Sequence, residues 1–255
     1  MSIKDMQLPR RGGRIRTVIW FVLFALSLVI TLPWLLVSRL RKGMSKWTYA
    51  HRKAKWWARF LLWVAGARIE VIGREHLVDE TTLFVGNHSG NFDIPICITQ
   101  LPGPAGFVSK IENARLPLVH AWMHEIGCIF IDHADMRQQV RSFGEAGKRI
   151  EQGLSYIIFP EGTRSLDGAI GEFKPGAFKL ATKNEIAIQP FAIVGSPDLM
   201  RKGSPWIRPA RIRLVFGERI PYEEGMNRET VALSERVKKE VERLYEQYRF
   251  QSHSA

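Results

Sequence analysis

The stretch Leu154-Ser155-Tyr156-Ile157-Ile158-Phe159-Pro160-Glu161-Gly162-Thr163-Arg164-Ser165 decides the fold of this 255-residue chain. Its first half is a short, mostly apolar run, which is typical of a strand buried in a parallel sheet. The run ends at a proline and a glycine, residues that stop a strand and open a turn. The polar loop that follows therefore lies at the carboxyl end of a buried strand, where α/β proteins gather their ligands.

A second loop begins in the same way. The apolar run 83–86 is followed by Asn87-His88-Ser89-Gly90-Asn91-Phe92-Asp93, and its Asn and Gly residues suit a tightly turned, open loop. Because both loops follow apolar strand runs, we expect them side by side at one edge of the sheet.

The body of the chain alternates strand-like and helix-like patterns. Predicted strands are residues 68–72, 81–86, 106–109, 128–132, 155–159, 188–194 and 211–216, and predicted helices are 94–100, 116–125, 135–152, 176–183 and 228–250. This alternation predicts an α/β fold with a mostly parallel sheet flanked by helices. The last helix has one apolar side, as expected of a helix that covers a sheet.

The first 66 residues have a different character. Residues 17–38 carry no charge and would form a helix about 33 Å long, enough to cross a bilayer. Pro33 can kink that helix, so a tilted or re-entrant helix is about as well supported as a simple span. Residues 47–66 interleave tryptophans with Lys and Arg, which favours an interfacial return arm over a helix packed on the domain. We therefore divide the chain into a membrane-embedded or interfacial helical hairpin (1–66) and an α/β domain (67–255).

The charge of the chain is concentrated in the same region. The formal net charge is +12, and residues 1–55 hold 12 Lys or Arg but a single acid, Asp5. Basic residues that flank an apolar segment indicate anionic membrane lipids as partners, whereas nucleic-acid binding would favour a basic face on the folded domain. Cys97 and Cys128 are too few for a disulfide framework and lack metal-site spacing, which predicts a reducing compartment.

His88 and Asp93 are the candidate catalytic pair. Five residues apart, they would not share one face of a regular helix. If His88 lies in the loop and Asp93 opens the next helix, the carboxylate can orient one ring nitrogen and leave the other free as a base.

The second loop supplies a candidate phosphate clamp. In Glu161-Gly162-Thr163-Arg164, a guanidinium stands beside a glycine that permits close backbone approach, which suits a phosphate group. Lys174 adds a second cation directly before Pro175 and a predicted helix start.

These motifs resemble those of the glycerophospholipid acyltransferases, most closely the bacterial 1-acyl-sn-glycerol-3-phosphate acyltransferases. The family's N-H-x4-D motif is matched by Asn87, His88 and Asp93, and its F-P-E-G-T-R-S motif by residues 159–165. Further matches are Gly171, Phe173, Lys174, Gly176 and Ala177; Ile188 and Pro190 to Ile193; and Gly127, Phe130, Ile131 and Asp132. This combination over about residues 70–220 is highly specific. One departure is His133, which stands where the family has an arginine.

The resemblance implies a membrane-bound enzyme that transfers an acyl chain from acyl-CoA or acyl carrier protein to the sn-2 hydroxyl of 1-acyl-sn-glycerol-3-phosphate. It implies that His88 is the base, that Glu161 shapes the site or holds the acceptor, and that Gly162, Thr163 and Arg164 approach the phosphate. Either His133 or Arg137 replaces the family arginine, or phosphate recognition relies on Arg164 and Lys174. No metal or cofactor is expected. The expected location is the cytoplasmic or inner membrane, with the active site facing the cytoplasm.

Other functions fit less of the sequence. A family member that acts on another lysolipid, including a lyso-ornithine-type lipid without the phosphate, is the main alternative, and a non-enzymatic membrane scaffold leaves both polar motifs unexplained. No G-x-S-x-G motif of a serine hydrolase is present. His120 and His124 have the i, i+4 spacing of a metal pair, but they lack the Glu of H-E-x-x-H and a third ligand.

Overall fold

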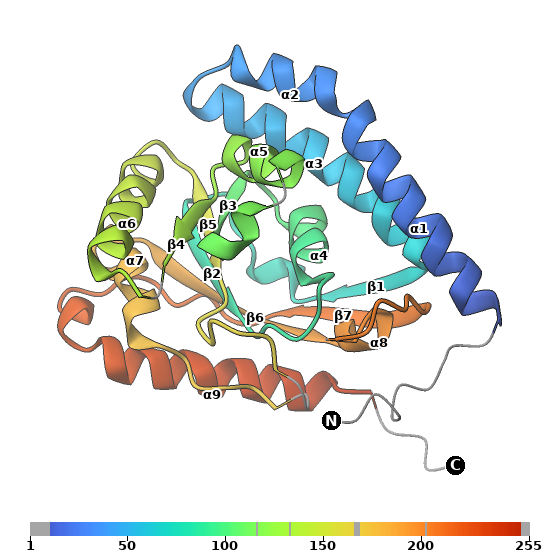
Figure 1. Cartoon of the computed structure of the whole chain (residues 1–255). Coiled ribbons are helices and arrows are strands. Elements are labelled where there is room, and N and C mark those ends of the chain that lie inside the picture. The colour runs from blue at the N-terminus through green and yellow to red at the C-terminus, as the bar shows by residue number, and fades with distance from the viewer. Residues whose placement is uncertain (1–10, 116, 133, 166–168, 202, 251–255) are drawn as a thin grey trace.

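The computed structural model describes residues 11–115, 117–132, 134–165, 169–201 and 203–250. Its centre is a seven-stranded sheet with the order β1-β7-β6-β2-β5-β3-β4 (Figure 1). The strands are β1 Ala67–Ile72, β2 Thr82–Gly86, β3 Ala105–Lys110, β4 Ile129–Ile131, β5 Ser155–Ile158, β6 Ala187–Val194 and β7 Ala210–Phe216. Paired strands are parallel except for β6 and β7, so the expected mostly parallel sheet is confirmed.

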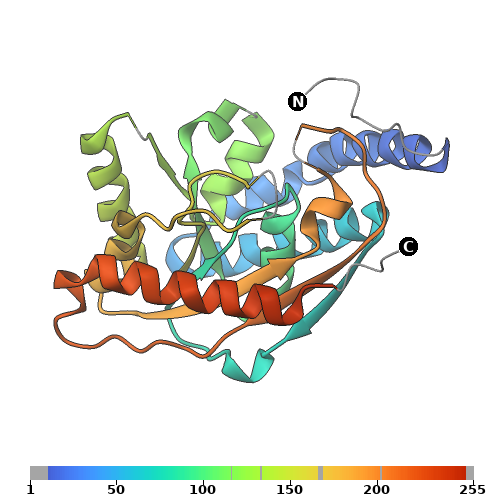
Figure 2. The same cartoon turned by 90° about the horizontal axis from the view of Figure 1, so that it is seen from below.

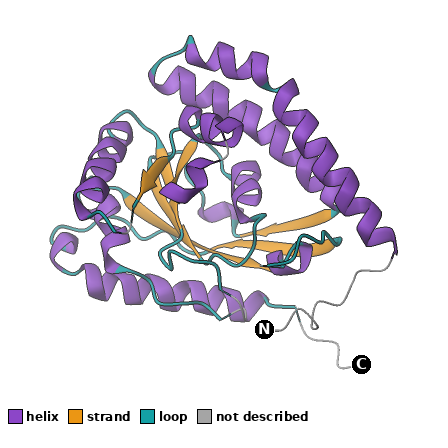
Figure 3. Cartoon of the chain, viewed as in Figure 1, coloured by secondary structure: helices purple, strands orange, loops and turns teal. Residues whose placement is uncertain are grey.

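Helices cover both faces of the sheet (Figure 3). On one face lie α1 Arg11–Ile30, α3 Gly43–Ala65, α4 Asp93–Gln100 and α5 Pro117–Glu125. On the other lie α6 Met136–Ile150, α7 Lys179–Thr182 and α9 Thr230–Tyr248, with α9 running along the sheet (Figure 2). The described residues also form α2 Leu32–Arg39, α8 Ser196–Leu199 and the short 3-10 turns η2 Arg74–His76, η3 Ile111–Arg115, η4 Pro175–Phe178 and η5 Met226–Arg228.

The strand pattern explains the two layers. Successive side chains of a strand point to opposite faces, so Phe84 and Ile157 join the core under α3 and α4, while Leu83 and Tyr156 join the core under α6 and α9. Each predicted strand and helix of the body matches an observed element within a few residues. The predicted helix 176–183 is divided into η4 and α7, because its first turn is tightened into a 3-10 helix after Pro175.

The N-terminal helices pack directly on the α/β body. α1 and α2 are separated at Thr31, and Pro33 sits in the first turn of α2, where its missing N–H is not needed. α3 buries an alanine-rich face against α4 and shares the core of the body. The tryptophans of the predicted interfacial arm differ in burial. Trp47 is buried in the protein, so the prediction is wrong for this side chain, whereas Trp56 (55%) and Trp63 (76%) are exposed.

The outer side of α1 remains apolar and uncovered. By length and composition, residues Gly13–Arg39 could cross a membrane, and 22% of the most apolar segment of this stretch is buried. The exposed apolar side chains are Ile15, Val18, Ile19, Phe21, Val22, Leu26, Val29 and Ile30. An apolar surface of this extent marks an interaction site.

Candidate active site

The register of two neighbouring strands brings the polar loops together. Val85 of β2 is paired with Ile158 of β5, so the residues three positions further along, His88 and Glu161, meet beyond the same edge of the sheet. The His88 N–H donates to Glu161 Oε1 at 2.7 Å, and the Ser165 N–H donates to the His88 carbonyl at 3.0 Å. The expected side-by-side placement of the two loops is confirmed.

His88 and Asp93 form a direct hydrogen bond. His88 Nδ1 lies 2.7 Å from Asp93 Oδ2, and Asp93, which is fully buried, is the first residue of α4. Because a carboxylate only accepts, Nδ1 carries the proton and Nε2 is left as the basic nitrogen. The same Oδ2 also accepts the N–H groups of Ser89 and Gly90, at 2.8 and 2.9 Å. The carboxylate therefore holds both the imidazole and the loop that carries it.

Asn87 fixes the start of this loop to the sheet. Its side-chain amide donates to the carbonyl of Ile193 at 3.0 Å and accepts the N–H of the same residue at 2.8 Å. Ile193 belongs to β6, the neighbour of β2 on the side away from β5. The His88 loop is thus tied to the strands on both sides of β2.

Glu161 is buried and holds two loop segments together. Its two carboxylate oxygens accept the N–H groups of His88 and Gly171, at 2.7 and 2.8 Å. Burial raises the pKa of Glu161 above its ordinary value of 4.5, although these two hydrogen bonds oppose the rise. Gly162, at φ 69°, takes the left-handed conformation that lets the chain turn sharply after Glu161.

The cationic residues of the second loop lie at the same edge of the sheet as His88. The Arg164 guanidinium donates to Asn91 Oδ1, which links the two motif loops through their side chains. Thr163 and Lys174 are exposed, and the Lys174 N–H donates to the carbonyl of Pro160 at 3.2 Å. The structure therefore brings together Glu161, Gly162, Thr163, Arg164 and Lys174 around His88, as the sequence predicts.

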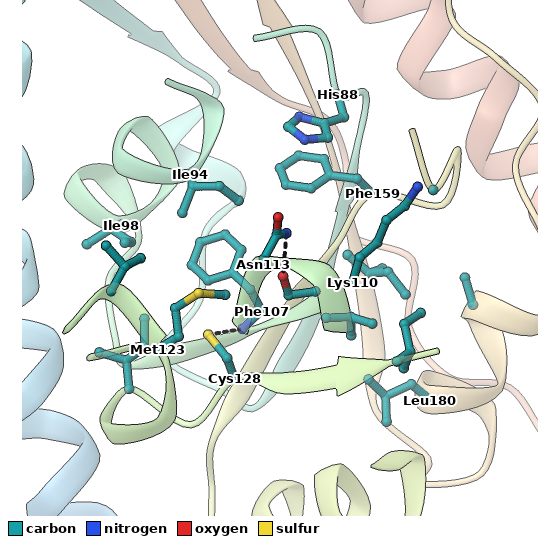
Figure 4. A pocket seen from close by; sticks show the side chains of 18 of the residues that line it. His88, Ile94, Ile98, Phe107, Lys110, Asn113, Met123, Cys128, Phe159 and Leu180 are labelled. Carbon is teal, nitrogen blue, oxygen red and sulfur yellow. Dashed lines mark hydrogen bonds between the residues drawn. The ribbon is translucent and has the colours of Figure 1, made fainter. Parts of the chain in front are cut away.

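A cavity of about 1150 Å³ opens below His88 (Figure 4). On one side of it lie apolar residues of α4 and α5, among them Ile94, Ile98 and Met123, and on the other side lie Lys110 and Leu180. The apolar side extends under the N-terminal helices and ends at Trp20, Phe24, Leu28 and Trp57. The imidazole of His88 stacks on Phe159 at a centroid distance of 4.4 Å, which fixes its tilt over the opening.

One of the predicted phosphate-binding residues, Arg137, is not among the residues that line the cavity. Arg137 is exposed on α6, and the residues of that helix that line the cavity near it are Met136, Gln139 and Val140. The prediction for His133 lies outside the described residues.

Lys110 is a cation that the sequence analysis did not name. It is the last residue of β3 and lines the cavity (Figure 4). The sequence feature that could have identified Lys110 is its position directly after the predicted strand 106–109, because the strand ends at this edge of the sheet face the site.

The structure also describes the side chains of metal-binding type and the two cysteines. Among the residues that the structure describes, no group of three or more His, Cys, Asp or Glu side chains has a metal-binding arrangement. Cys97 and Cys128 are both buried free thiols, and burial raises the pKa of Cys128 to about 12.

Comparison with known proteins identifies the family. A family model described as Acyltransferase matches residues 68–194. A 1-acyl-sn-glycerol-3-phosphate acyltransferase of Limnanthes alba is 30% identical over 202 residues, which cover 77% of this chain and 70% of the relative. The chain belongs to the acyltransferase family.

Other members extend this comparison across distant organisms. A probable 1-acyl-sn-glycerol-3-phosphate acyltransferase of Mycoplasma pneumoniae is 36% identical over 144 residues, 53% of this acyltransferase and 52% of the relative. A 1-acyl-sn-glycerol-3-phosphate acyltransferase of Chlamydomonas reinhardtii is 32% identical over 157 residues, 60% of this chain and 47% of the relative. The chain thus spans about half the length of these two curated relatives.

A solved structure has the same fold. The crystal structure of the 1-acyl-sn-glycerophosphate (LPA) acyltransferase PlsC of Thermotoga maritima superposes with a TM-score of 0.79 and 23% sequence identity. The match covers 93% of this acyltransferase and 97% of that chain, so the similarity in fold includes the N-terminal helices.

Proposed function

We propose that this chain transfers an acyl group from an acyl thioester, on coenzyme A or acyl carrier protein, to the sn-2 hydroxyl of 1-acyl-sn-glycerol-3-phosphate, giving phosphatidic acid. The observation that carries this proposal is the 2.7 Å His88–Asp93 pair at the mouth of a large, partly apolar cavity rimmed by cations. The names of the relatives in this family support the same acceptor.

The chemistry follows from the single free nitrogen of the His88 ring. His88 Nε2 removes the hydroxyl proton of the acceptor, and the oxygen attacks the thioester carbonyl to form a tetrahedral intermediate. The intermediate collapses, the C–S bond breaks, and the proton on His88 passes to the departing thiolate. Asp93 keeps the proton on Nδ1 and stabilises the imidazolium that forms in between. No acyl-enzyme, metal or cofactor takes part in this proposed sequence.

The acceptor's phosphate is held by the cationic rim. Arg164 and Lys174 follow the end of β5, beside His88. Lys110 lies inside the same cavity at the end of β3, the neighbour of β5 in the sheet. A guanidinium pairs well with phosphate oxygens, and lysines add charge without fixed geometry. Acyl chains occupy the apolar side of the cavity under α1, α3, α4 and α5, where they leave water.

The N-terminal helices bind the membrane along their length. The inner side of α1 is held to the body, because Trp20 Nε1 donates to the Leu61 carbonyl at 2.9 Å and the Ile207 N–H donates to Thr17 Oγ1 at 2.9 Å. A helix held in this way lies in the membrane surface with its apolar outer side in the lipid, while basic side chains such as Lys53 meet anionic headgroups. We place the protein at the cytoplasmic membrane with its site toward the cytoplasm, consistent with its free thiols.

A reconstituted assay tests the reaction. Purified protein in detergent or vesicles is offered 1-acyl-sn-glycerol-3-phosphate and other lysolipids, including a lyso-ornithine lipid, with both thioester donors, and products are identified by mass spectrometry. We expect the wild type to form phosphatidic acid and the His88→Ala variant to form none. The matched control is His76→Ala, in η2 and outside the cavity, and its rate of product formation should equal that of the wild type. Turnover retained by His88→Ala would refute the base assignment, and turnover of phosphate-free lysolipids alone would refute the acceptor.

A second variant tests the clamp. Arg164→Ala is expected to raise the KM for the phosphorylated acceptor about tenfold or more, since a charge-assisted contact is worth about 1.5–3 kcal/mol. The KM for the donor should stay constant. A rise confined to the donor would contradict the assignment.

A further inference from the structure

The cavity has a second branch that neither the acyl chains nor the acceptor phosphate requires. Beyond the cationic rim it continues between α6 and the segment formed by η4 and α7. Its walls there are Val140, Gly144, Gly147 and Lys148 on one side and Gly176, Lys179, Lys183 and Asn184 on the other. We call this branch the α6–α7 groove; the two helices lie next to each other in Figure 1.

The groove is open where glycines line it. A Cβ built on Gly144 or on Gly176 meets no heavy atom within 4 Å, so both positions face free space. At Gly147 the helices close, since a Cβ there would stand 2.8 Å from Asn184 Oδ1. A slim, unbranched chain fits such a passage, and a folded protein domain does not.

Positive charge rims the groove. Lys179 and Lys183 stand one turn apart on the exposed side of α7, whose other side buries Leu180 and Ala181. Within the described part of the chain neither lysine forms an ion pair. Lys148 on α6 is paired with Glu145 at 3.2 Å, but both side chains are exposed and such pairs are weak. Glu151 is the acidic side chain of this branch, so the lysines outnumber it.

The reaction needs a ligand of this shape and charge. The thioester must reach His88 on a carrier, and both coenzyme A and acyl carrier protein present it on phosphopantetheine. This thin chain ends in a phosphate that belongs to a phosphodiester in acyl carrier protein and to a diphosphate in coenzyme A. We propose that the α6–α7 groove binds the phosphopantetheine arm of the acyl donor, with Lys179 and Lys183 on its phosphate. The proposal rests on the proposed acyl transfer and adds to it a donor path separate from the acceptor clamp.

Two variants test the groove by different means. Lys179→Glu combined with Lys183→Glu reverses its charge, and Lys239→Glu, on the exposed side of α9, is the control for a surface charge change. Gly144→Leu extends a side chain into the groove from a position where an added Cβ meets no heavy atom within 4 Å, and it replaces a helical glycine by a better helix former. The thermal unfolding temperature of Gly144→Leu should therefore not fall, which separates obstruction from misfolding.

The readout is the KM for three donors. With acyl-CoA or acyl carrier protein, whichever the wild type uses, the lysine double variant is expected to raise the donor KM about tenfold or more and to leave the acceptor KM unchanged. With acyl-pantetheine, which lacks the phosphate, wild type and double variant should be equal. Gly144→Leu should raise the KM of every donor.

The outcomes separate this inference from the proposed function. Unchanged donor KM values in both variants, or an equal rise with acyl-pantetheine in the lysine variant, would overturn the groove assignment while acyl transfer stands. A higher KM of the lysine double variant for acyl-CoA or for acyl carrier protein supports the groove assignment and identifies the carrier. A wild type that uses none of the donors refutes the acyl transfer itself.

Discussion

Asp93→Asn is the most informative single substitution in this site. The carboxylate accepts three hydrogen bonds on one oxygen: from His88 Nδ1 at 2.7 Å and from the Ser89 and Gly90 N–H groups at 2.8 and 2.9 Å. The asparagine amide has the same shape, so its oxygen can still accept from the two backbone groups. With its oxygen in that place, the amide has no negative charge to stabilise the imidazolium. With its NH2 group there instead, it favours the tautomer with the proton on Nε2 and gives up both backbone hydrogen bonds.

The two consequences have different sizes. In the wrong tautomer Nε2 is no longer a base, and the comparable change in a Ser-His-Asp triad lowers kcat by about 10⁴. We therefore expect kcat to fall by about 10³–10⁴. Stability suffers less, because charged hydrogen bonds become neutral ones, each weaker by about 1 kcal/mol, or about 2–3 kcal/mol in all. For a chain of this size that lowers the unfolding temperature by about 5–10 °C.

The assay measures thiol release at saturating donor and acceptor, together with thermal unfolding. Asp135→Asn is the matched control, because Asp135 caps α6 by accepting the Gln138 N–H at 3.0 Å and Asn is an equally good cap. That control should change neither kcat nor stability. If the Asp93→Asn variant is folded and retains kcat within tenfold of the wild type, the orienting role of Asp93 is refuted.

Three further outcomes follow from buried groups. Because burial raises the pKa of Glu161, the unfolded chain releases this proton at lower pH than the folded one, so the group's contribution to the free energy of unfolding declines as pH rises above 4.5. The stability difference between wild type and Glu161→Gln, measured by urea unfolding, should therefore shrink with rising pH; growth would contradict the burial argument. Glu125 is buried and lies 3.2 Å from Lys46, so Glu125→Leu should cost about 2–3 kcal/mol, and a second change, Lys46→Met, should recover part of the loss. A pKa of about 12 keeps Cys128 a thiol, so a disulfide reagent at pH 8 should react with it only after denaturant is added, and prompt reaction in the native protein would show that this site is open.

The fold could be predicted because its strands are apolar runs ended by turn residues. The runs 83–86 and 155–159 became neighbouring strands, and the two polar loops met for that reason alone. Strand order could not be predicted, since it depends on pairings between distant segments, among them the antiparallel pair of β6 and β7. The burial of Trp47 was also out of reach, because tryptophans interleaved with lysines suit a lipid surface and a helix interface equally well.

The site residues differ in how far the sequence could predict them. His88 was predicted as the reactive group, and its geometry agrees. The cavity could not be read from the sequence, because its walls come from elements far apart in the chain, and Lys110 joins it only through the position of β3. Arg137 is on α6 but is not among the residues that line the cavity, and the sequence could not show this because it depends on how α6 packs on the rest of the domain.

The motif residues around His88 share one structural property that explains their number. Asn87 is hydrogen-bonded to the backbone of Ile193, Asp93 to two N–H groups of its own loop, and Glu161 to the N–H groups of His88 and Gly171. Each of these side chains therefore holds a loop to a strand, to a helix start or to the other loop, so much of the motif serves position. A base that must meet a hydroxyl and a thioester together gains most from this arrangement, because small misplacements of reacting groups cost large factors in rate. The consequence is that conservative changes at Asn87 and Glu161 should lower kcat through the placement of His88 although neither side chain exchanges a proton with the substrate.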